Sequence, residues 1–287
     1  MDQTRIAAPA APLRGLVAAY DGYRQRGLAP ASHRGLPSPY LTVIFTFDVP
    51  LVVLEHPDPA QPPATFDALV GGLHTCPARI VHDGAQAGVQ VRMSPLGARA
   101  LLGMPAAALA GADVHGAEVL GDLAARVCER LTSAGSWSER FAQVDAALLE
   151  QLTRTQVGAR RAGPTPALDW AWRAVVGSGG RARVGELADR VGWSERHLTG
   201  RFRAEYGLTP KTALRLARFD RARRRIGAHA RDGAAGERAS LARVAASTGY
   251  ADQSHLAREF RHFAGVAPSR WVAEEFGNVQ ATPARRG

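Results

Sequence analysis

Residues 241–268 read LARVAASTGYADQSHLAREFRHFAGVAP, and this stretch decides the fold of the C-terminal half of the chain. It repeats the segment VGELADRVGWSERHLTGRFRAEYGLTP of residues 184–210. The offset between matched residues is 57 before the turn and 58 after it, so the second copy carries one extra residue. The matched pairs are Leu187/Val244, Ala188/Ala245, Gly192/Gly249, Trp193/Tyr250, Leu198/Leu256, Phe202/Phe260, Gly207/Gly265 and Pro210/Pro268. Matches of similar chemical type at a fixed offset indicate two copies of one structural unit.

Each copy has the parts of a helix-turn-helix unit. A short helix carries a small alanine, Ala188 or Ala245, which lets a second helix cross it closely. Gly192 and Gly249 tolerate the positive φ that a tight turn needs. The second helix places apolar residues four positions apart and ends at a glycine, and a proline follows where the next helix begins. Thr209 is the expected N-cap of that next helix.

Two more helices complete the predicted helical region. Before the first copy, residues 168–176 repeat apolar side chains at the spacing of one helix face, which predicts a support helix. Between the copies, residues 210–228 predict a helix that acts as a rigid spacer. Its expected inward side chains are Leu214, Ala222 and Ile226, and its arginines Arg215, Arg221, Arg223, Arg224 and Arg225 are expected to cover the remaining surface.

The N-terminal half has a different pattern, with strands followed by helices. Residues 40–49 (YLTVIFTFDV), 51–54 and 87–93 are β-branched, aromatic or alternating runs, which predict strands. Residues 122–131 and 140–152 carry apolar side chains at helical spacing, which predicts a helical hairpin. We therefore expect an α+β N-terminal domain that is β-rich, with a cupin-like arrangement as the working hypothesis, followed by an all-α C-terminal domain.

Charge is divided unequally between the two halves. Residues 1–159 hold 12 arginines against 14 acidic residues, whereas residues 160–287 hold 24 basic residues against 12 acidic ones. A basic domain joined to a near-neutral one indicates contact with a polyanion, most often nucleic acid. A coding bias towards arginine produces a similar excess, so charge alone does not identify the partner.

No pattern in the sequence indicates catalysis, a cofactor or a metal. The ligand-type residues of the N-terminal half, His33, Glu55, His56, Asp58, His74, Cys76, His82 and Asp83, lack the spacing of known metal sites. No serine elbow or phosphate-binding loop is present, and Cys76 and Cys128 show no pairing pattern. No apolar run is long enough for a membrane span, and no signal segment is recognisable. We expect a cytoplasmic protein with no catalytic, cofactor or metal site.

Residues 168–276 resemble the tandem helix-turn-helix DNA-binding domain of the AraC/XylS family of bacterial transcription regulators. The motifs that carry the resemblance are LADRVGWSERHLTGRFRAEYGLTP, the run RARRRI and AASTGYADQSHLAREFRHFAGVAPSRW. It covers about 110 of the 287 residues. The family implies a two-lobed domain of seven helices that reads two adjacent major-groove segments of DNA, held ~34 Å apart by the spacer.

The resemblance assigns DNA contacts to particular residues of the two recognition helices. They are Arg196, His197, Thr199, Gly200 and Arg201 in the first motif, and Gln253, Ser254, His255 and Arg258 in the second. Arginine donates to guanine and glutamine pairs with adenine, while serine and histidine serve bases or phosphates. Gly200 departs from the family, where a longer polar residue is common, so the first motif has fewer base-reading side chains. Trp193 and Tyr250 are expected in the core.

The leading interpretation is a transcription regulator that binds promoter DNA. The expected domains are a sensor or dimerisation domain over 1–152, a linker over 153–167, the DNA-binding domain over 168–276 and a disordered tail over 277–287. Expected partners are an unknown small-molecule effector, RNA polymerase and a second copy of the chain, with no membrane. The expected dimer interface is the apolar face of the helical hairpin, formed by Leu123, Val127, Leu131, Phe141, Val144 and Leu148, and packing of most of these residues on the sheet is the alternative.

Two other interpretations stay open at this point. One is an enzyme or repair domain fused to a DNA-targeting helix-turn-helix module, and the other is a constitutive DNA-binding protein whose N-terminal half only dimerises. We take activation of transcription as the working hypothesis. The sequence itself does not separate an activator from a repressor, because that depends on where the operator lies relative to the polymerase.

Overall fold

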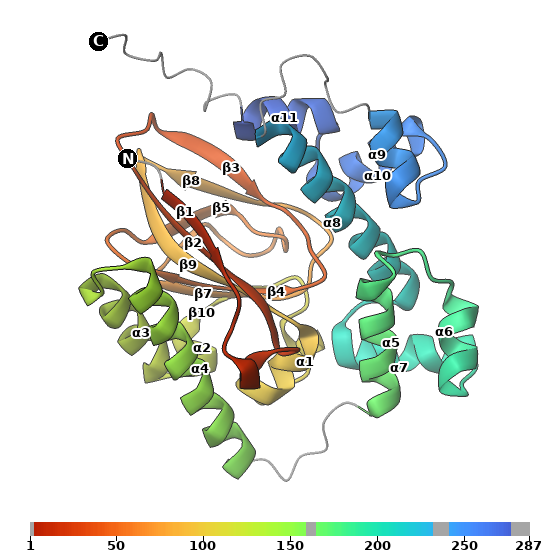
Figure 1. Ribbon diagram of the computed structural model, residues 1–287, viewed down its shortest axis with the longest axis horizontal. Coiled ribbons are helices and arrows are strands. Elements are labelled where there is room, and N and C mark those ends of the chain that lie inside the picture. Colours follow the sequence, from red (N-terminus) through yellow and green to blue (C-terminus); the bar gives the residue numbers. More distant parts are fainter. Residues whose placement is uncertain (1–2, 159–164, 232–240, 277–287) are drawn as a thin grey trace.

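The computed structural model describes residues 3–158, 165–231 and 241–276. Figure 1 shows a β-rich region beside a helical region that follows it in the chain. We call the described residues from 3 to 158 the sheet domain and those from 165 to 276 the helical domain. The expected tail, 277–287, and residues 159–164 of the expected linker lie outside the described residues. This order of a β-rich part and a helical part confirms the fold class predicted from the sequence.

The sheet domain contains two antiparallel sheets. Six strands form one sheet, in the order β1 (Gln3–Ala7), β2 (Val17–Arg26), β9 (Ala85–Met93), β4 (Leu41–Thr46), β7 (Ala68–Gly71) and β10 (Asp113–His115). Four strands form the other, in the order β3 (Ala31–Gly35), β8 (Ala78–His82), β5 (Leu51–Glu55) and β6 (Ala64–Phe66). The strands predicted at 40–49, 51–54 and 87–93 correspond to β4, β5 and β9. Apolar side chains such as Ile44 and Ile80 form a small core between the sheets.

Helices cover the outer face of the six-stranded sheet. The predicted hairpin consists of α3 (Asp122–Ser133) and α4 (Trp137–Gly158). Shorter elements are η1 (Ala11–Leu13), α1 (Pro95–Gly97), η2 (Ala98–Leu102), η3 (Ala106–Leu109) and α2 (Gly116–Leu120). The rings of Trp137 and Phe141 lie directly over Gly22 of β2, where a side chain would overlap them. The hairpin therefore sits on the sheet without intervening space.

The apolar face of this hairpin is buried inside the chain. The buried residues are Leu123, Val127, Leu131, Val144 and Leu148, each at most 1% exposed. Phe141 is half-buried and stacks on Tyr20, with ring centroids 6.0 Å apart. The prediction that these six residues form a dimer interface is therefore wrong, because they pack on the sheet of their own chain. Homodimerisation itself stays a prediction.

The helical domain contains the two predicted helix-turn-helix motifs. The first consists of α6 (Val184–Val191) and α7 (Glu195–Tyr206), and the second of α9 (Leu241–Thr248) and α10 (Gln253–Ala264). α5 (Pro166–Gly177) precedes the first motif and α11 (Pro268–Phe276) follows the second. Gly192 and Gly249 have φ values of 72° and 86° at the two turns, as the repeat requires. We call α5–α7 the first lobe and α9–α11 the second lobe.

α8 (Pro210–Arg231) joins the lobes and packs against both of them. The Thr209 hydroxyl accepts a hydrogen bond from the Thr212 N–H (3.1 Å), which confirms the expected N-cap. Further along, the Phe219 ring contacts Phe260 and Phe263 of α10, with centroids 5.1 and 5.0 Å apart. The three side chains predicted to face inward are all buried. Because one helix completes the cores of both lobes, it fixes the lobes relative to each other.

The N-terminal end of the expected linker is helical. α4 continues to Gly158, so residues 153–158 extend the hairpin, and α5 begins at Pro166. Arg154 pairs with Glu150 one turn earlier (2.5 Å), a spacing that supports the added turn. The sequence pattern missed this turn because its side chains carry no apolar stripe.

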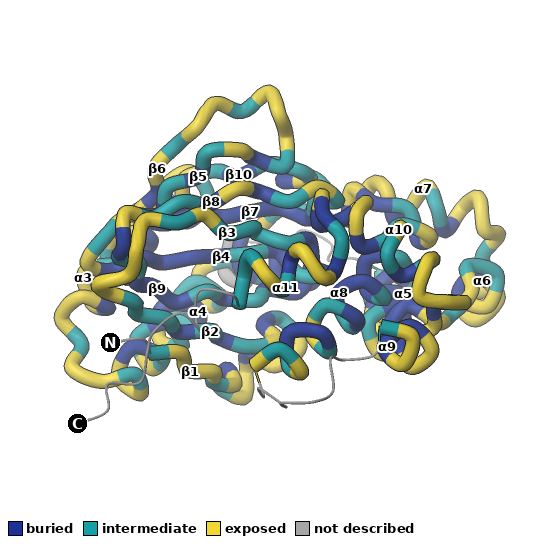
Figure 2. Tube along the Cα trace, turned by 90° about the horizontal axis from the view of Figure 1, so that it is seen from above, coloured by how far each residue is buried: buried dark blue, intermediate teal, exposed yellow. Residues whose placement is uncertain are grey.

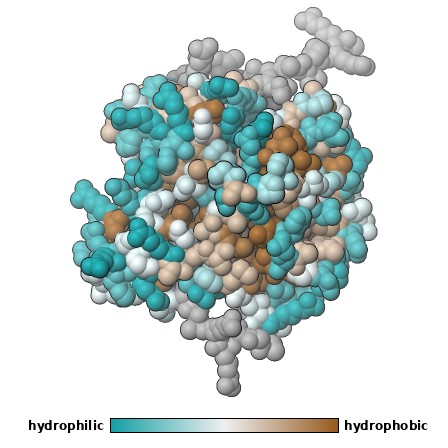
Figure 3. Space-filling model, turned by 180° about the vertical axis from the view of Figure 1, so that it is seen from behind, coloured by the Kyte–Doolittle hydropathy of each residue, from teal (hydrophilic) through white to brown (hydrophobic). Residues whose placement is uncertain are grey.

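Buried residues concentrate between the layers, and exposed ones follow the outer loops and helix faces (Figure 2). On the reverse face, apolar surface gathers towards the middle and polar side chains surround it (Figure 3). Three large apolar side chains of the described residues are well exposed, namely Ile6, Leu28 and Trp170. None of the described helices has the length and apolar character needed to span a membrane.

The substitution Gly180→Ala tests the close packing of α8 on the first lobe. Gly180, in the α5–α6 loop, has a φ of 77°, and an added Cβ would overlap the carbonyl oxygen of Leu214 in α8. We expect the free energy of unfolding to fall by about 2–4 kcal/mol. Gly192→Ala is the matched control, with a φ of 72° and open space at its Cβ, and should cost about 1 kcal/mol. Urea denaturation measures both, and equal losses would contradict the packing.

Candidate nucleic-acid interface

The two recognition helices expose the residues that the sequence predicts at the DNA. On α7, Arg196, His197, Gly200 and Arg201 are exposed and Thr199 is half-buried. On α10, Gln253, Ser254 and Arg258 are exposed and His255 is half-buried. The opposite faces of the two helices bury the repeat-equivalent Phe202 and Phe260 in the lobe cores. Each helix therefore presents its predicted contact residues away from its own lobe.

Side-chain caps hold the N-termini of both recognition helices. The Ser194 hydroxyl accepts a hydrogen bond from the His197 N–H (3.2 Å), and the Asp252 carboxylate accepts one from the His255 N–H (2.7 Å). Both caps stand at equivalent positions of the repeat. The first turns are thus ordered at the end of the helix where backbone N–H groups and the helix dipole favour a phosphate.

A histidine packs edge-on against an aromatic ring in both motifs. The rings of Trp193 and His197 have centroids 4.7 Å apart, and those of Tyr250 and His255 are 5.2 Å apart. The Ala251 N–H also points to Nδ1 of His255 (3.5 Å). Sequence reasoning treated the two aromatics only as core. The repeat could have predicted this contact, because Trp193 matches Tyr250 at the offset of 57 and His197 matches His255 at the offset of 58.

Three arginines of the interface have no carboxylate partner among the described residues. They are Arg196, Arg201 and Arg258, and all three are exposed. Elsewhere many arginines of the helical domain are ion-paired. An exposed cation without a protein partner retains its full attraction for phosphate or for a guanine edge.

The second recognition helix is tied to α8 by a forked ion pair. The Arg215 guanidinium donates to both carboxylate oxygens of Glu259 on α10, at 2.7 and 3.1 Å. Arg218 of α8 contacts both lobes. It donates to the Gly180 carbonyl in the first lobe (2.7 Å), and its guanidinium lies 5.7 Å from the Tyr250 ring in the second. These contacts fix α10 and the α5–α6 loop on a common helix.

Two of the spacer arginines that were expected to cover the helix surface also form contacts within the chain. Arg223 and Arg224 both pair with the buried carboxylate of Asp220, at 2.7 and 2.9 Å. The Arg224 guanidinium also lies 5.8 Å from the Tyr40 ring of the sheet domain. The buried carboxylate of Asp220 attracts the two arginines that follow it on α8. Both side chains therefore make ion pairs within the chain.

The sheet domain docks directly on the end of the first recognition helix. Arg99 donates to both oxygens of Glu205 on α7, at 2.5 and 2.7 Å, and the Glu205 carboxylate is almost fully buried. This hydrogen-bonded pair raises the pKa of Arg99 above its ordinary value. Beside it, Gly207 lies so close to Ala110, which follows η3, that a Cβ at Gly207 would overlap it. The domains therefore meet through the last turn of α7.

A second contact reaches the other lobe. Arg34 of β3 forms an ion pair with Glu274 on α11, and Arg270 of α11 donates to the same carboxylate (2.7 Å). The hydrogen bond from Arg270, together with the charge of Arg34, lowers the pKa of Glu274. The sheet domain thus touches both lobes, at Glu205 in the first and at Glu274 in the second.

Other clusters of reactive side chains lie away from this interface. The buried His56 holds Asp113 through Nδ1 (2.8 Å), and His33 and His82 face each other with ring centroids 6.4 Å apart. The described residues contain no group of three His, Cys, Asp or Glu side chains able to hold a metal ion. Burial raises the pKa of the Cys128 thiol to about 11, which keeps it protonated and unreactive at neutral pH.

Comparisons with known families match two parts of the chain. The family described as a helix-turn-helix domain matches residues 187–274, which span both motifs and α8. A domain of unknown function, DUF6597, matches residues 5–115, which form most of the sheet domain. No curated protein sequence matches the chain.

Solved structures of transcription regulators are similar to this chain to different degrees. An apo variant of ToxT from Vibrio cholerae is similar with a TM-score of 0.50 and 11% identity, over 89% of this chain and 96% of that chain. ToxT from Vibrio cholerae bound to an unsaturated fatty acid gives 0.49 and 10%, over 89% and 94%. The xylose-binding transcription activator XylR gives 0.32 and 16%, over 46% and 38%. At 11% identity, the likeness to the apo ToxT variant concerns the fold alone.

A tandem helix-turn-helix domain with exposed, capped recognition helices defines a DNA-binding protein of the transcription-regulator class. More particularly, the chain carries a helix-turn-helix domain of the AraC type at its C-terminus, as the resemblance of the sequence predicted.

The substitution Arg99→Ala tests the contact between the sheet domain and α7. It leaves the Glu205 carboxylate buried without a partner, so we expect a loss of about 2–4 kcal/mol in the free energy of unfolding. Arg154→Ala is the matched control, because it removes a single exposed ion pair with Glu150 and should cost less than about 0.5 kcal/mol. A loss from Arg99→Ala no larger than the control loss would contradict a docked interface.

Proposed function

We propose that this protein controls transcription by placing α7 and α10 in two adjacent major-groove segments of promoter DNA. The proposed contacts are Arg196, His197, Thr199, Gly200 and Arg201 on α7, and Gln253, Ser254, His255 and Arg258 on α10. The proposal rests on the observation that the two motifs expose their recognition helices in the same way. In both motifs a side-chain cap orders the first turn, a ring packs on the third-residue histidine, and arginines without carboxylate partners stand outside.

The two helices contribute unequally to this proposed contact. α10 offers Gln253 and Arg258, which pair with adenine and guanine edges respectively. On α7, Gly200 has no side chain and open space around its Cα, so Arg196 and Arg201 are the long donors that remain. We therefore assign most of the base reading to the second motif and much of the phosphate contact to the first.

The sheet domain is the proposed sensor of a small-molecule effector. Its contacts with Glu205 and Glu274 give it one point of attachment on each lobe, so a change in its shape alters both. We further propose that the protein acts in the cytoplasm as an activator with RNA polymerase as a partner, works as a homodimer, and has no catalytic role. The division into a sensor domain over 1–152, a linker over 153–167 and a DNA-binding domain over 168–276 belongs to the same proposal.

The substitution Arg258→Ala tests the function on a site obtained by selecting genomic fragments that the full-length protein binds. We expect it to cost about 1–3 kcal/mol in binding to that site and to relax base preference at one position. The matched control is Arg224→Ala, whose side chain is held by Asp220 and Tyr40 and should leave DNA affinity unchanged. Fluorescence anisotropy on selected and random duplexes measures both.

Two outcomes would contradict this assignment. Equal losses from Arg258→Ala on selected and random DNA would make Arg258 a phosphate contact. Failure of the full-length protein to enrich any genomic fragment would contradict the proposed function as a whole.

A further inference from the structure

A cavity of about 410 Å³ lies at one end of the two sheets of the sheet domain. Its walls come from β2, β4, β5, β8 and β9, and the turns after β4 and β8 form its rim. This volume lies within the range of small-molecule sites, about 300–1,000 Å³. The cavity lies at the far end of β3 from the contact between Arg34 and Glu274.

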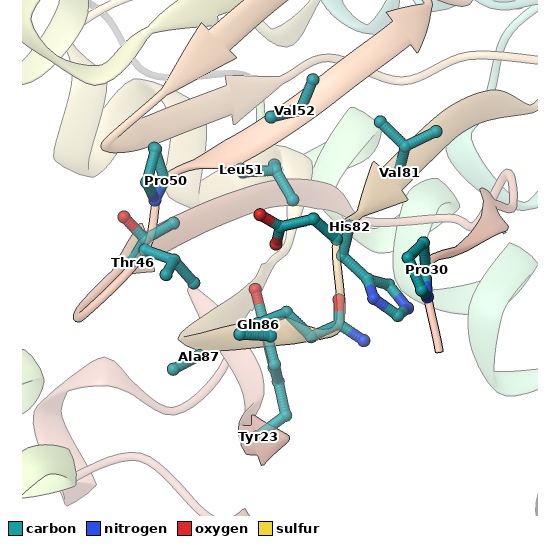
Figure 4. Close-up of a pocket in the computed structure, with 13 residues that line it drawn as sticks. Tyr23, Pro30, Thr46, Pro50, Leu51, Val52, Val81, His82, Gln86 and Ala87 are labelled. Atoms are coloured by element: carbon teal, nitrogen blue, oxygen red, sulfur yellow. The ribbon is translucent and has the colours of Figure 1, made fainter. Parts of the chain in front are cut away.

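One wall of the cavity is polar and the rest is apolar. The polar side chains of the lining include Tyr23, His82 and Gln86, which Figure 4 shows directed to the same region between the sheets. The apolar side chains come from the rim and from β5, and include Pro30, Pro50 and Leu51. An apolar enclosure with a few convergent hydrogen-bonding groups is the usual composition of a site for a small organic molecule.

The strand register places these polar groups inside the sandwich. Tyr23 of β2 pairs with Gly88 of β9, and the absence of a Cβ at Gly88 makes room for the Tyr23 hydroxyl. Gln86 lies two residues before Gly88 on the same face of β9. The space between packed sheets is normally filled by apolar side chains, as it is around Ile44 and Ile80 at the other end. The polar side chains at this end of the sandwich are therefore unusual, and the stability of the fold does not require them.

Among the residues that the structure describes, no arginine or lysine side chain lines the cavity. Arg24 and Arg26, on the nearby strand β2, both pair with Asp48, each at 2.8 Å. The one carboxylate that lines the cavity, Asp83, is exposed at the rim and would repel an anion.

We propose that this cavity binds an uncharged small molecule that has an apolar body and a hydrogen-bonding group directed at Tyr23, His82 and Gln86. Gln86 donates one hydrogen bond to Gln25 through its amide nitrogen, and its second N–H, its amide oxygen and the Tyr23 hydroxyl supply the donors and acceptors that fit an alcohol, amide or amine group. The molecule is the effector of the proposed regulator, and in that respect the inference rests on the proposed function.

β3 connects the cavity to the second lobe. Pro30 lines the cavity, Ala31 pairs with His82 of β8, and Arg34 three residues later holds Glu274 on α11. A ligand that displaces the start of β3 therefore shifts the strand that carries the interdomain ion pair. Binding in the cavity would therefore affect the position of the second lobe, which carries most of the proposed base reading.

The experiment uses two fluorescent probes with the same aromatic skeleton. N-phenylnaphthylamine is uncharged with one N–H group, whereas anilinonaphthalene sulfonate adds an anionic group. We expect the full-length protein to bind the uncharged probe with saturation at one site, and the sulfonate about tenfold or more weakly, because the described lining holds no arginine or lysine that would compensate its burial. Equal affinity for the two probes would overturn the proposed ligand class.

Two pairs of variants locate the site. Leu51→Trp, on the face of β5 that points between the sheets, fills the cavity and should abolish saturable binding of the uncharged probe, whereas Ala125→Trp, on the exposed face of α3, should leave it unchanged. Gln86→Leu should weaken binding about threefold to tenfold through the loss of a hydrogen bond, whereas Gln143→Leu on α4 should not. Probe binding that survives Leu51→Trp would overturn the assignment of the site.

The DNA affinity of the same variants distinguishes a failure of the cavity proposal from a failure of the proposed DNA-binding function. If Leu51→Trp folds, binds the selected DNA and loses the probe, the cavity is a ligand site on a working regulator. If the wild-type protein binds DNA but shows no saturable probe binding, the cavity proposal fails and the proposed DNA function stands. Thermal unfolding of each variant verifies that the fold is retained.

Discussion

Helix α8 imposes the constraint on which the rest of the structure depends, because it contributes to the cores of both lobes. Phe219 packs on two rings of α10, and Gly180 of the first lobe lies directly against the α8 backbone. Arg215 ties the same helix to Glu259 on the second recognition helix. With apolar packing and a forked ion pair on one rigid element, the lobes have little freedom to change their spacing. Two recognition helices held in this way bind DNA as one unit.

The sheet domain adds a second level of control to this unit. It holds Glu205, at the end of α7, and Glu274, on α11, through arginines of its own. The first of these carboxylates is buried, so its ion pair cannot be broken without leaving a desolvated charge, while the second is more exposed and easier to exchange. The first contact is suited to docking and the second to adjustment. In the proposed mechanism, an effector would act on these polar contacts and leave the DNA-binding surface intact.

The sequence predicted the helical domain well because its elements repeat. Paired glycines, apolar residues four apart and the prolines after each motif each have one structural meaning, and they agree with one another. The sheet domain was predicted less completely, since β2 (VAAYDGYRQR) turns polar side chains into the sandwich and does not alternate clearly. Ion pairs such as Arg99 with Glu205 join residues more than a hundred positions apart and leave no local pattern. The apolar face of the hairpin was placed in a dimer interface because burial within a chain and between chains have the same periodicity.

Hydroxyl-radical footprinting of the full-length protein on its selected site tests the central claim most directly. Two recognition helices fixed by α8 should protect two backbone segments on one face of the DNA, separated by about one helical turn of 10 base pairs for each bound copy. The pattern should be the same at every strong site, because the spacing is set by the protein. A single protected segment per copy, or a separation that varies from site to site, would contradict a rigid pair of recognition helices.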